Sequence, residues 1–184
     1  MNDSAIKIDM SEKFLHLTHA PIVEAVIEIR ARTQISWDQN AIAAWLKPRL
    51  PDYPIAHMQN EFHAEVTFEP QGITKQNHCN LGLKGVRFQS ADKLHVAQFN
   101  RDGFVFSRLQ PYENWRQLRS EAIRLWALHC ELAKPADIQR LGLRFINRIL
   151  VMAEKIQLEE YLRIPPQSPP NLNLPLTGAS LNSV

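Results

Sequence analysis

The chain has 184 residues, of which 45% are hydrophobic and 22% are charged, and its formal net charge at pH 7 is +2. This composition is typical of one globular domain and excludes a disordered or fibrous chain. A net charge this small does not by itself indicate nucleic-acid binding, which needs a concentrated basic face.

The first predicted element is a strand over residues 22–32, IVEAVIEIRAR. Apolar side chains alternate there with the charged residues Glu24, Glu28, Arg30 and Arg32. A period of two with many β-branched residues predicts a strand that has one buried face.

A helix is predicted after this strand. Ser36 and Gln39 have the spacing of a capping box, in which each side chain bonds a free backbone N–H of the first turn. Ile42 and Trp45 then recur at helical spacing, and Pro48 ends the helix. We expect this helix to lie across the sheet.

Residues 62–108 predict an antiparallel meander, with strands in HAEVTFEP, CNLGLKGVRFQS, KLHVAQFN and GFVFSRL. The segments SADK and NRDG between them are polar turn clusters. Four aromatic residues share a face with apolar neighbours, namely Phe88, Phe99, Phe104 and Phe106. We expect them in the core and not on a base-stacking platform.

A long amphipathic helix is predicted over residues 112–134. Its apolar stripe includes Trp115, Leu118 and Leu125, and Pro135 follows its end. Two roles are open for this helix, because its stripe can pack on the sheet or against a second copy in a homodimer.

The segment DIQRLGLRFINRILV, residues 137–151, carries Arg140, Arg144 and Arg148 at every fourth position. A spacing of four keeps residues on one side of both a helix and a strand. Leu143 joins the other apolar residues on one face only if the period is two, and Gly142 weakens a helix. We therefore predict a strand whose arginines share one face.

These elements have the order β-α-β-β-β-β-α-β. They predict the α+β class, with a mainly antiparallel sheet and two main helices packed on one face. We expect an N-terminal extension over residues 1–13 and a single domain over residues 14–164, which ends in a short helix at LEEYLRI. A proline-rich tail at 165–184 is expected to be disordered.

Several segments resemble a sporadically distributed bacterial family of uncharacterised proteins. They are LTHAPIVEAVIEIR, VRFQSADKLHVAQFNRDGFVFSRLQPYENW, RLGLRFINRI and EEYLRIPP. The resemblance implies a similar fold and a prokaryotic origin, and it carries over no activity, cofactor or catalytic residue. Members of that family continue with further strands, so this chain is expected to be a C-terminally shortened form with an exposed sheet edge or apolar face.

The arginine stripe is the candidate site. If Glu24 and Glu28 lie on the neighbouring strand, cross-strand ion pairs with the arginines finish the sheet face. If the arginines exceed these carboxylates, their forked donors bind an anion or an acidic partner, and Arg30 extends the patch.

Our first functional hypothesis is a non-catalytic binding module in which the charged sheet face or exposed edge engages a protein partner or a second copy. The second is an enzyme or receptor that holds a small anionic ligand on the arginine stripe. Nucleic-acid binding by the same face is a weaker third.

No Walker loop, GxGxxG, GxSxG or HExxH motif occurs, and the seven histidines have no zinc-site spacing. Glu24 and Glu28 would stand about 13 Å apart along a strand, too far for a glycosidase pair. We expect no metal and no cofactor. Cys79 and Cys130 lack a disulfide or CxxC pattern, and neither a secretory leader nor a membrane segment is evident, so we expect a soluble cytoplasmic protein.

Overall fold

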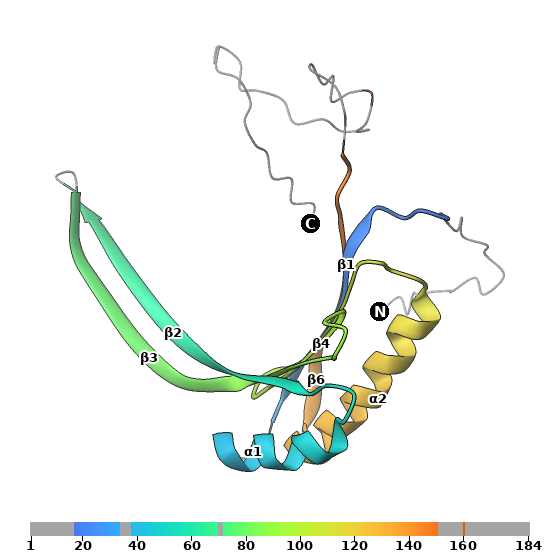
Figure 1. Ribbon diagram of the computed structural model, residues 1–184. Helices are drawn as coiled ribbons and strands as arrows, with labels where there is room; N and C mark the ends of the chain where they lie inside the picture. The colour runs from blue at the N-terminus through green and yellow to red at the C-terminus, as the bar shows by residue number, and fades with distance from the viewer. Residues whose placement is uncertain (1–16, 34–37, 70–71, 151–159, 161–184) are drawn as a thin grey trace, which may run out of the picture. The chain divides into compact units, whose positions relative to one another are not determined.

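The computed structural model describes residues 17–33, 38–69, 72–150 and residue 160 (Figure 1). The chain divides into two compact units, Met1–Arg148 and Ile149–Val184. All the described strands, both α-helices and the 3-10 helix η1 belong to the first unit. The N-terminal extension, the tail and most of the helix expected at LEEYLRI lie outside the described residues.

The described elements follow the expected order. They are β1 (Ile22–Arg32), α1 (Gln39–Leu46), the 3-10 helix η1 (Lys47–Arg49), β2 (Ile55–Glu69), β3 (Gly72–Gln89), β4 (His95–Asn100), β5 (Gly103–Leu109), α2 (Trp115–Ala133) and β6 (Asp137–Asn147). The strands form one sheet in the order β2-β3-β4-β5-β1-β6, and all neighbours are antiparallel. The predicted α+β class is confirmed.

The hydrophobic core lies between the sheet and the two helices. Alternate residues of β1, β3, β4 and β5 point into it, and Phe88, Phe99, Phe104 and Phe106 are all fully buried, as expected. Side chains from α1 and α2 join the same cluster, among them Ile42, Leu46, Leu118 and Leu125. Most of the predicted stripe of α2 therefore packs on its own sheet, whereas Trp115 is exposed.

The start of α1 differs from the prediction. Its N-cap is Asp38, whose carboxylate accepts a hydrogen bond from the backbone N–H of Ala41 at 2.8 Å, so the expected Ser36 box is not the cap of this helix. A carboxylate at the N-cap satisfies a free backbone donor as well as a serine does. Pro48 lies in η1, which continues the helix as a tighter turn.

Both ends of the second helix are set by residues next to them in the sequence. Asn114 caps α2 by accepting from the backbone N–H of Gln117 at 3.0 Å. Lys134 takes the left-handed conformation at the other end, and Pro135 follows. Among the described residues, no helix is long and apolar enough to cross a membrane.

The strands β2 and β3 are longer than predicted. They pair from Ile55 with Gln89 to Glu69 with Gly72, whereas β4 pairs only with the last part of β3, from Gly85 to Gln89. The rest of the hairpin is a two-stranded arm, which Figure 1 shows continuing past the other strands. The sequence pattern does not predict this arm, because the run TKQNH is polar throughout and lacks an alternation of apolar and polar residues.

Candidate functional site

The arginine segment forms β6, an extended strand at one side of the sheet, as the period of two predicts. It pairs with β1 so that Leu143 lies opposite Ile27 and Gly142 lies opposite Glu28. Paired residues project to the same face of a sheet. The leucine-bearing side of β6 therefore faces the helix layer, and the arginines face the other way.

A row of apolar side chains on the helix side of β6 remains exposed. Leu141 is 71% exposed and Leu143 is 52% exposed, and Ile138 and Phe145 continue the row. The helices do not cover it because α2 packs mainly over β1 and β5, and α1 packs over β3. Contiguous exposed apolar surface is characteristic of an interaction site.

On the opposite face, Glu28 is held by two arginines. Arg140 donates from Nη2 to its carboxylate at 2.5 Å, and Arg30 donates from Nε at 3.1 Å. Partial burial alone would raise the pKa of Glu28, but these two bonds outweigh it and hold the pKa below its usual value. Gly142, opposite Glu28, leaves the space into which the carboxylate extends.

The remaining predicted residues are not drawn into this cluster. Arg144 lies opposite Val26 on the same face, is exposed, and forms no ion pair within the described part of the chain. Arg148 follows the end of β6, and its guanidinium donates to Gln110 Oε1 at 3.4 Å. Glu24, opposite Ile146, likewise has no ion pair with any described residue.

We call β6 and its two faces the edge surface. It consists of the outer edge of β6, the apolar row Ile138, Leu141, Leu143 and Phe145, and the arginines Arg140 and Arg144. Within the described residues, no strand pairs with its outer edge. Free backbone donors and acceptors on an edge strand are a template for a further strand.

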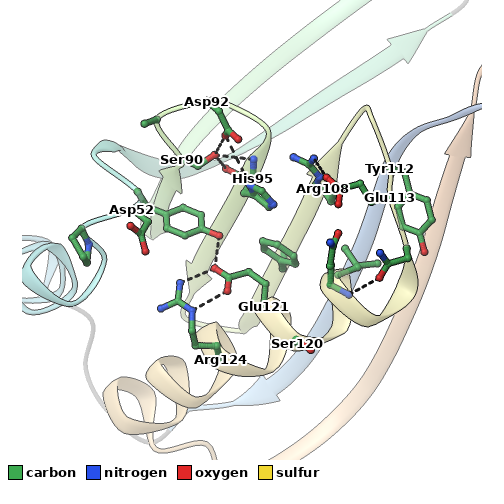
Figure 2. A pocket seen from close by; sticks show the side chains of 17 residues that line it. Asp52, Ser90, Asp92, His95, Arg108, Tyr112, Glu113, Ser120, Glu121 and Arg124 are labelled. Atoms are coloured by element: carbon green, nitrogen blue, oxygen red, sulfur yellow. Dashed lines mark hydrogen bonds and ion pairs between the residues drawn. The ribbon is translucent and has the colours of Figure 1, made fainter.

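A second candidate site is a pocket of about 890 Å³ on the helix side of the sheet (Figure 2). Its walls come from the segment before β2, the turn between β3 and β4, the loop before α2, and the first half of α2. We call it the polar pocket, because most of the side chains that line it are charged or hydroxyl-bearing.

Arg108 of β5 lies at the floor of the polar pocket and is only 9% exposed. Its Nη2 donates to Glu113 at 3.3 Å, and its Nη1 is buried with no partner. Figure 2 shows the guanidinium between His95 and Glu113. Burial lowers the pKa of His95, and the neighbouring Arg108 charge lowers it further.

One wall of the pocket is a hydrogen-bonded network on α2. Glu121 accepts from the hydroxyl of Tyr53 at 2.7 Å and from Nη2 of Arg124 at 2.6 Å. Burial raises the pKa of Tyr53, and its bond to the Glu121 carboxylate raises it further, so Tyr53 stays protonated. The network ties the segment before β2 to the helix and rigidifies that wall.

Ser90, Asp92 and His95 also line the pocket, but they are not arranged as a nucleophile and its base. The Ser90 hydroxyl donates to Asp92 at 2.5 Å and accepts from the backbone N–H of His95, so it closes the turn between β3 and β4. In a Ser-His-Asp triad the serine hydroxyl donates to the imidazole, whereas the Ser90 hydroxyl donates to a carboxylate and meets only the backbone of His95. The trio is therefore a structural turn.

Sequence reasoning missed the polar pocket, although one signal was present. Arg108 follows Phe104 and Phe106 at a spacing of two, which places a cation in an inward-facing position of the strand. A charge in an inward position is rare unless it is paired or functional. Asp92 and Glu121 gave no such signal, because only the fold brings them together.

Comparisons of the chain with known protein families, with curated proteins and with solved structures each give no match. The bacterial family resemblance stays a prediction. Any function proposed for the chain therefore depends on the geometry of the edge surface and of the polar pocket.

Proposed function

We propose that this protein is a non-catalytic interaction module that binds an extended segment of a partner protein as an additional strand on β6. The observation that carries the proposal is that β6 has an open edge among the described strands and an exposed apolar row on its helix side. Strand addition uses main-chain hydrogen bonds for affinity and alternate side chains for specificity.

The charge of the edge surface defines the partner. On the face away from the helices, Arg140 and Arg144 of the edge surface lie beside Arg30, Glu24 and Glu28 of β1, so the arginines exceed the carboxylates by one. An added strand that places a carboxylate beside Arg144 would pair this cation, and apolar residues at alternate positions would cover the leucine row. The partner segment is thus one in which acidic and apolar residues alternate.

A second copy of the chain fits this surface less well. Antiparallel self-pairing centred on Gly142 places Arg140 of each copy opposite Arg144 of the other, and like charges at opposed positions destabilise a sheet. Centring on Leu143 avoids that clash but still gathers the arginines of both copies on one face. The carboxylate of β6, that of Asp137, already pairs with Arg32 at 3.8 Å, so self-pairing brings no unpaired β6 carboxylate to compensate them.

The arginine stripe supports a small-ligand receptor less well than it supports strand addition. The hollow at Gly142 has a volume of only about 220 Å³, and Arg140 is already bonded to Glu28. Ligand pockets of drug-like size start at about 300 Å³. The apolar row on the other face would have no role in holding an anion.

The test is selection of peptides from a displayed library of fully randomised nine-residue segments on the purified protein. We expect selected peptides to alternate apolar with acidic residues. Their affinity should fall at least about tenfold for Arg144→Glu, because a charge-assisted contact is replaced by repulsion. Leu143→Lys should reduce binding similarly, since it places a charge in the apolar row.

Arg119→Glu is the matched control, because Arg119 is exposed, belongs to α2 and not to β6, and undergoes the same reversal of charge. Circular dichroism should show that all three variants remain folded. The proposal fails if the library yields no binder, or if selected peptides lack carboxylates. It also fails if light scattering shows a dimer that Leu143→Lys dissociates, since the occupant is then a second copy.

A further inference from the structure

Strand β2 has an apolar face that is exposed along the β2–β3 arm. At the base of the arm, Ala56 and Met58 lie opposite Phe88 and Val86, two core residues of β3, so the even-numbered positions of β2 face the helix side. The same face continues past the segment of β3 that pairs with β4, and there it carries Phe62, which is 66% exposed. Exposed large apolar side chains in a row are characteristic of an interaction surface.

The alternation of β2 persists in the outer part of the arm. Two register shifts lie between Gln59 and Phe62, and in both the extra residue, Lys84 or Leu81, belongs to β3. The extra residue of a bulge bends the strand that carries it, and the other strand keeps its period of two. Phe62 therefore lies on the helix side of β2, whereas the polar residues on either side of it lie on the opposite face.

The arm has little support within one copy of the chain. β4 pairs with β3 only from Gly85 to Gln89, and no described strand pairs with the outer edge of β2. A hairpin of two strands alone is at best marginally stable in water, and further strands are what usually stabilise it. The outer edge of β2 also offers free backbone donors and acceptors to such a strand.

We propose that two copies of the chain form a symmetric dimer in which their β2 strands pair antiparallel, centred on Phe62. In this register the two Phe62 side chains lie opposite each other, and Glu61 of each copy lies opposite His63 of the other. Facing aromatic residues and facing pairs of carboxylate and imidazole both stabilise neighbouring strands. The two sheets then join into one continuous sheet.

The chemistry of the polar face fits this register. Glu61 accepts from Arg101 through Oε2 at 2.6 Å, and its Oε1 has no partner among the described residues. His63 is exposed on the same strand face. An imidazole N–H of His63 in the second copy can therefore donate to Oε1, and the two-fold axis repeats this contact.

Other registers of the same pair fit less well. A shift by an odd number of residues would set the apolar face of one strand beside the polar face of the other. Centring on Glu61 would place two carboxylates opposite each other, and centring on Asn60 would place Glu61 opposite Gln59 and His57 opposite His63. Of the registers that match the faces, the one centred on Phe62 alone combines facing aromatic residues with carboxylate–imidazole pairs.

Pairing of β2 with β6 of another copy would not close. Each added copy would again leave one free β2 and one free β6, so the assembly would grow into an open filament. Two-fold pairing of β2 closes after two copies and is the commonest symmetry of soluble oligomers. It uses no residue of β6, so it leaves the edge surface free and does not depend on the function proposed for it.

The oligomeric state of the full chain tests the proposal, measured by light scattering and sedimentation at micromolar concentration. We expect a dimer, and Phe62→Lys should raise its dissociation constant at least about tenfold, because it places two ammonium groups opposite each other. Leu81→Lys is the matched control, since Leu81 is exposed in the same arm but belongs to β3. Leu81→Lys and Leu143→Lys should both remain dimers, and circular dichroism should show that all three variants are folded.

Cysteine cross-linking tests the register independently. Asn60 of one copy lies opposite Ala64 of the other, and opposed Cα atoms of antiparallel strands are about 4.5–5.5 Å apart, within disulfide range. Positions 60 and 64 of one strand are about 13 Å apart, which prevents a bond within one copy. In a Cys79→Ser background, Asn60→Cys combined with Ala64→Cys should give a covalent dimer on oxidation, and neither substitution alone should do so.

Four results would overturn the proposal. The first is a chain that stays monomeric, and the second is a dimer that Phe62→Lys leaves intact. The third is a dimer that Leu143→Lys dissociates, which would place the contact on β6. The fourth is a covalent dimer from Asn60→Cys or Ala64→Cys alone, or none from the two combined, because the strands are then not centred on Phe62.

Discussion

Acidification from about pH 7 to about pH 4 is expected to lower the free energy of unfolding by about 3 kcal/mol through His129 alone. Burial lowers the pKa of this histidine from the reference value of 6.5 to about 4. His129 is fully buried on α2, and its ring lies against Trp126, Phe99 and Phe104. An imidazolium ion at this position loses its hydration.

The direction of the effect follows from which state binds protons more readily. Between the unfolded pKa of 6.5 and the folded pKa of about 4, the unfolded chain is protonated at this histidine and the folded chain is not. Protons therefore favour unfolding throughout that range. The stabilisation is complete above the unfolded pKa and is lost as the pH falls towards the folded one.

Urea unfolding at a series of pH values measures this loss. His129→Leu should flatten the dependence between about pH 6.5 and 5, where most carboxylates are still ionised in both states. His57→Leu is the matched control, because His57 is exposed on β2 and is solvated before and after unfolding. If the free energy of unfolding of His129→Leu depends on pH as steeply as that of the parent protein, burial of His129 is not the cause of that dependence.

Gly103→Ala is expected to reduce the free energy of unfolding by at least about 3 kcal/mol, or to prevent folding. Gly103 begins β5 with φ of +141°, a conformation that side chains rarely adopt. An added Cβ would overlap the carbonyl oxygen of Ile29, in the backbone of β1. Relief of the clash needs displacement of β1 from β5 at the centre of the sheet, where these strands bury the core.

Substitutions at two other glycines distinguish the effect of the steric clash on stability from the effect of backbone strain. Gly82 has φ of +86° with nothing within 4 Å of an added Cβ, so Gly82→Ala should cost only about 1 kcal/mol. At Gly142 the added atom would meet the Glu28 side chain at an ordinary 3.6 Å, so Gly142→Ala should change stability by less than about 0.5 kcal/mol. Chemical denaturation of the three variants should give this ranking. Equal losses for Gly103→Ala and Gly82→Ala would mean that the sheet accommodates the methyl group.

Much of the fold follows from local pattern. The alternation in β1 and β6, the amphipathic stripe of α2 and the turn residues between β4 and β5 each depend on neighbours in the chain, and each of these elements is present. The exceptions also have local causes. The polar run in the β2–β3 arm conceals its period, and Asp38 competes with Ser36 as the first cap of α1.

The local sequence pattern predicted only part of the candidate site. Alternation correctly placed Arg140 and Arg144 on one face, and the same pattern carried on to Arg148, which lies beyond the last paired residue of β6. The backbone N–H of Arg148 still donates to the carbonyl oxygen of Pro21 at 2.9 Å, but the regular strand pairing ends at Asn147. The end of a strand is decided by its partner, here β1, whose register shifts near Ile22.

The sequence by itself determined which side chains share a face, because that depends only on the two-residue and 3.6-residue periods of the backbone. Only the tertiary structure decided which faces are covered. The helices lie over the middle of the sheet and leave the apolar row of β6 in solvent. The fold likewise brings Arg108, Asp92 and Glu121 into one pocket from separate parts of the chain. The strength of their electrostatic interactions depends on proximity and burial, and the sequence pattern encodes neither.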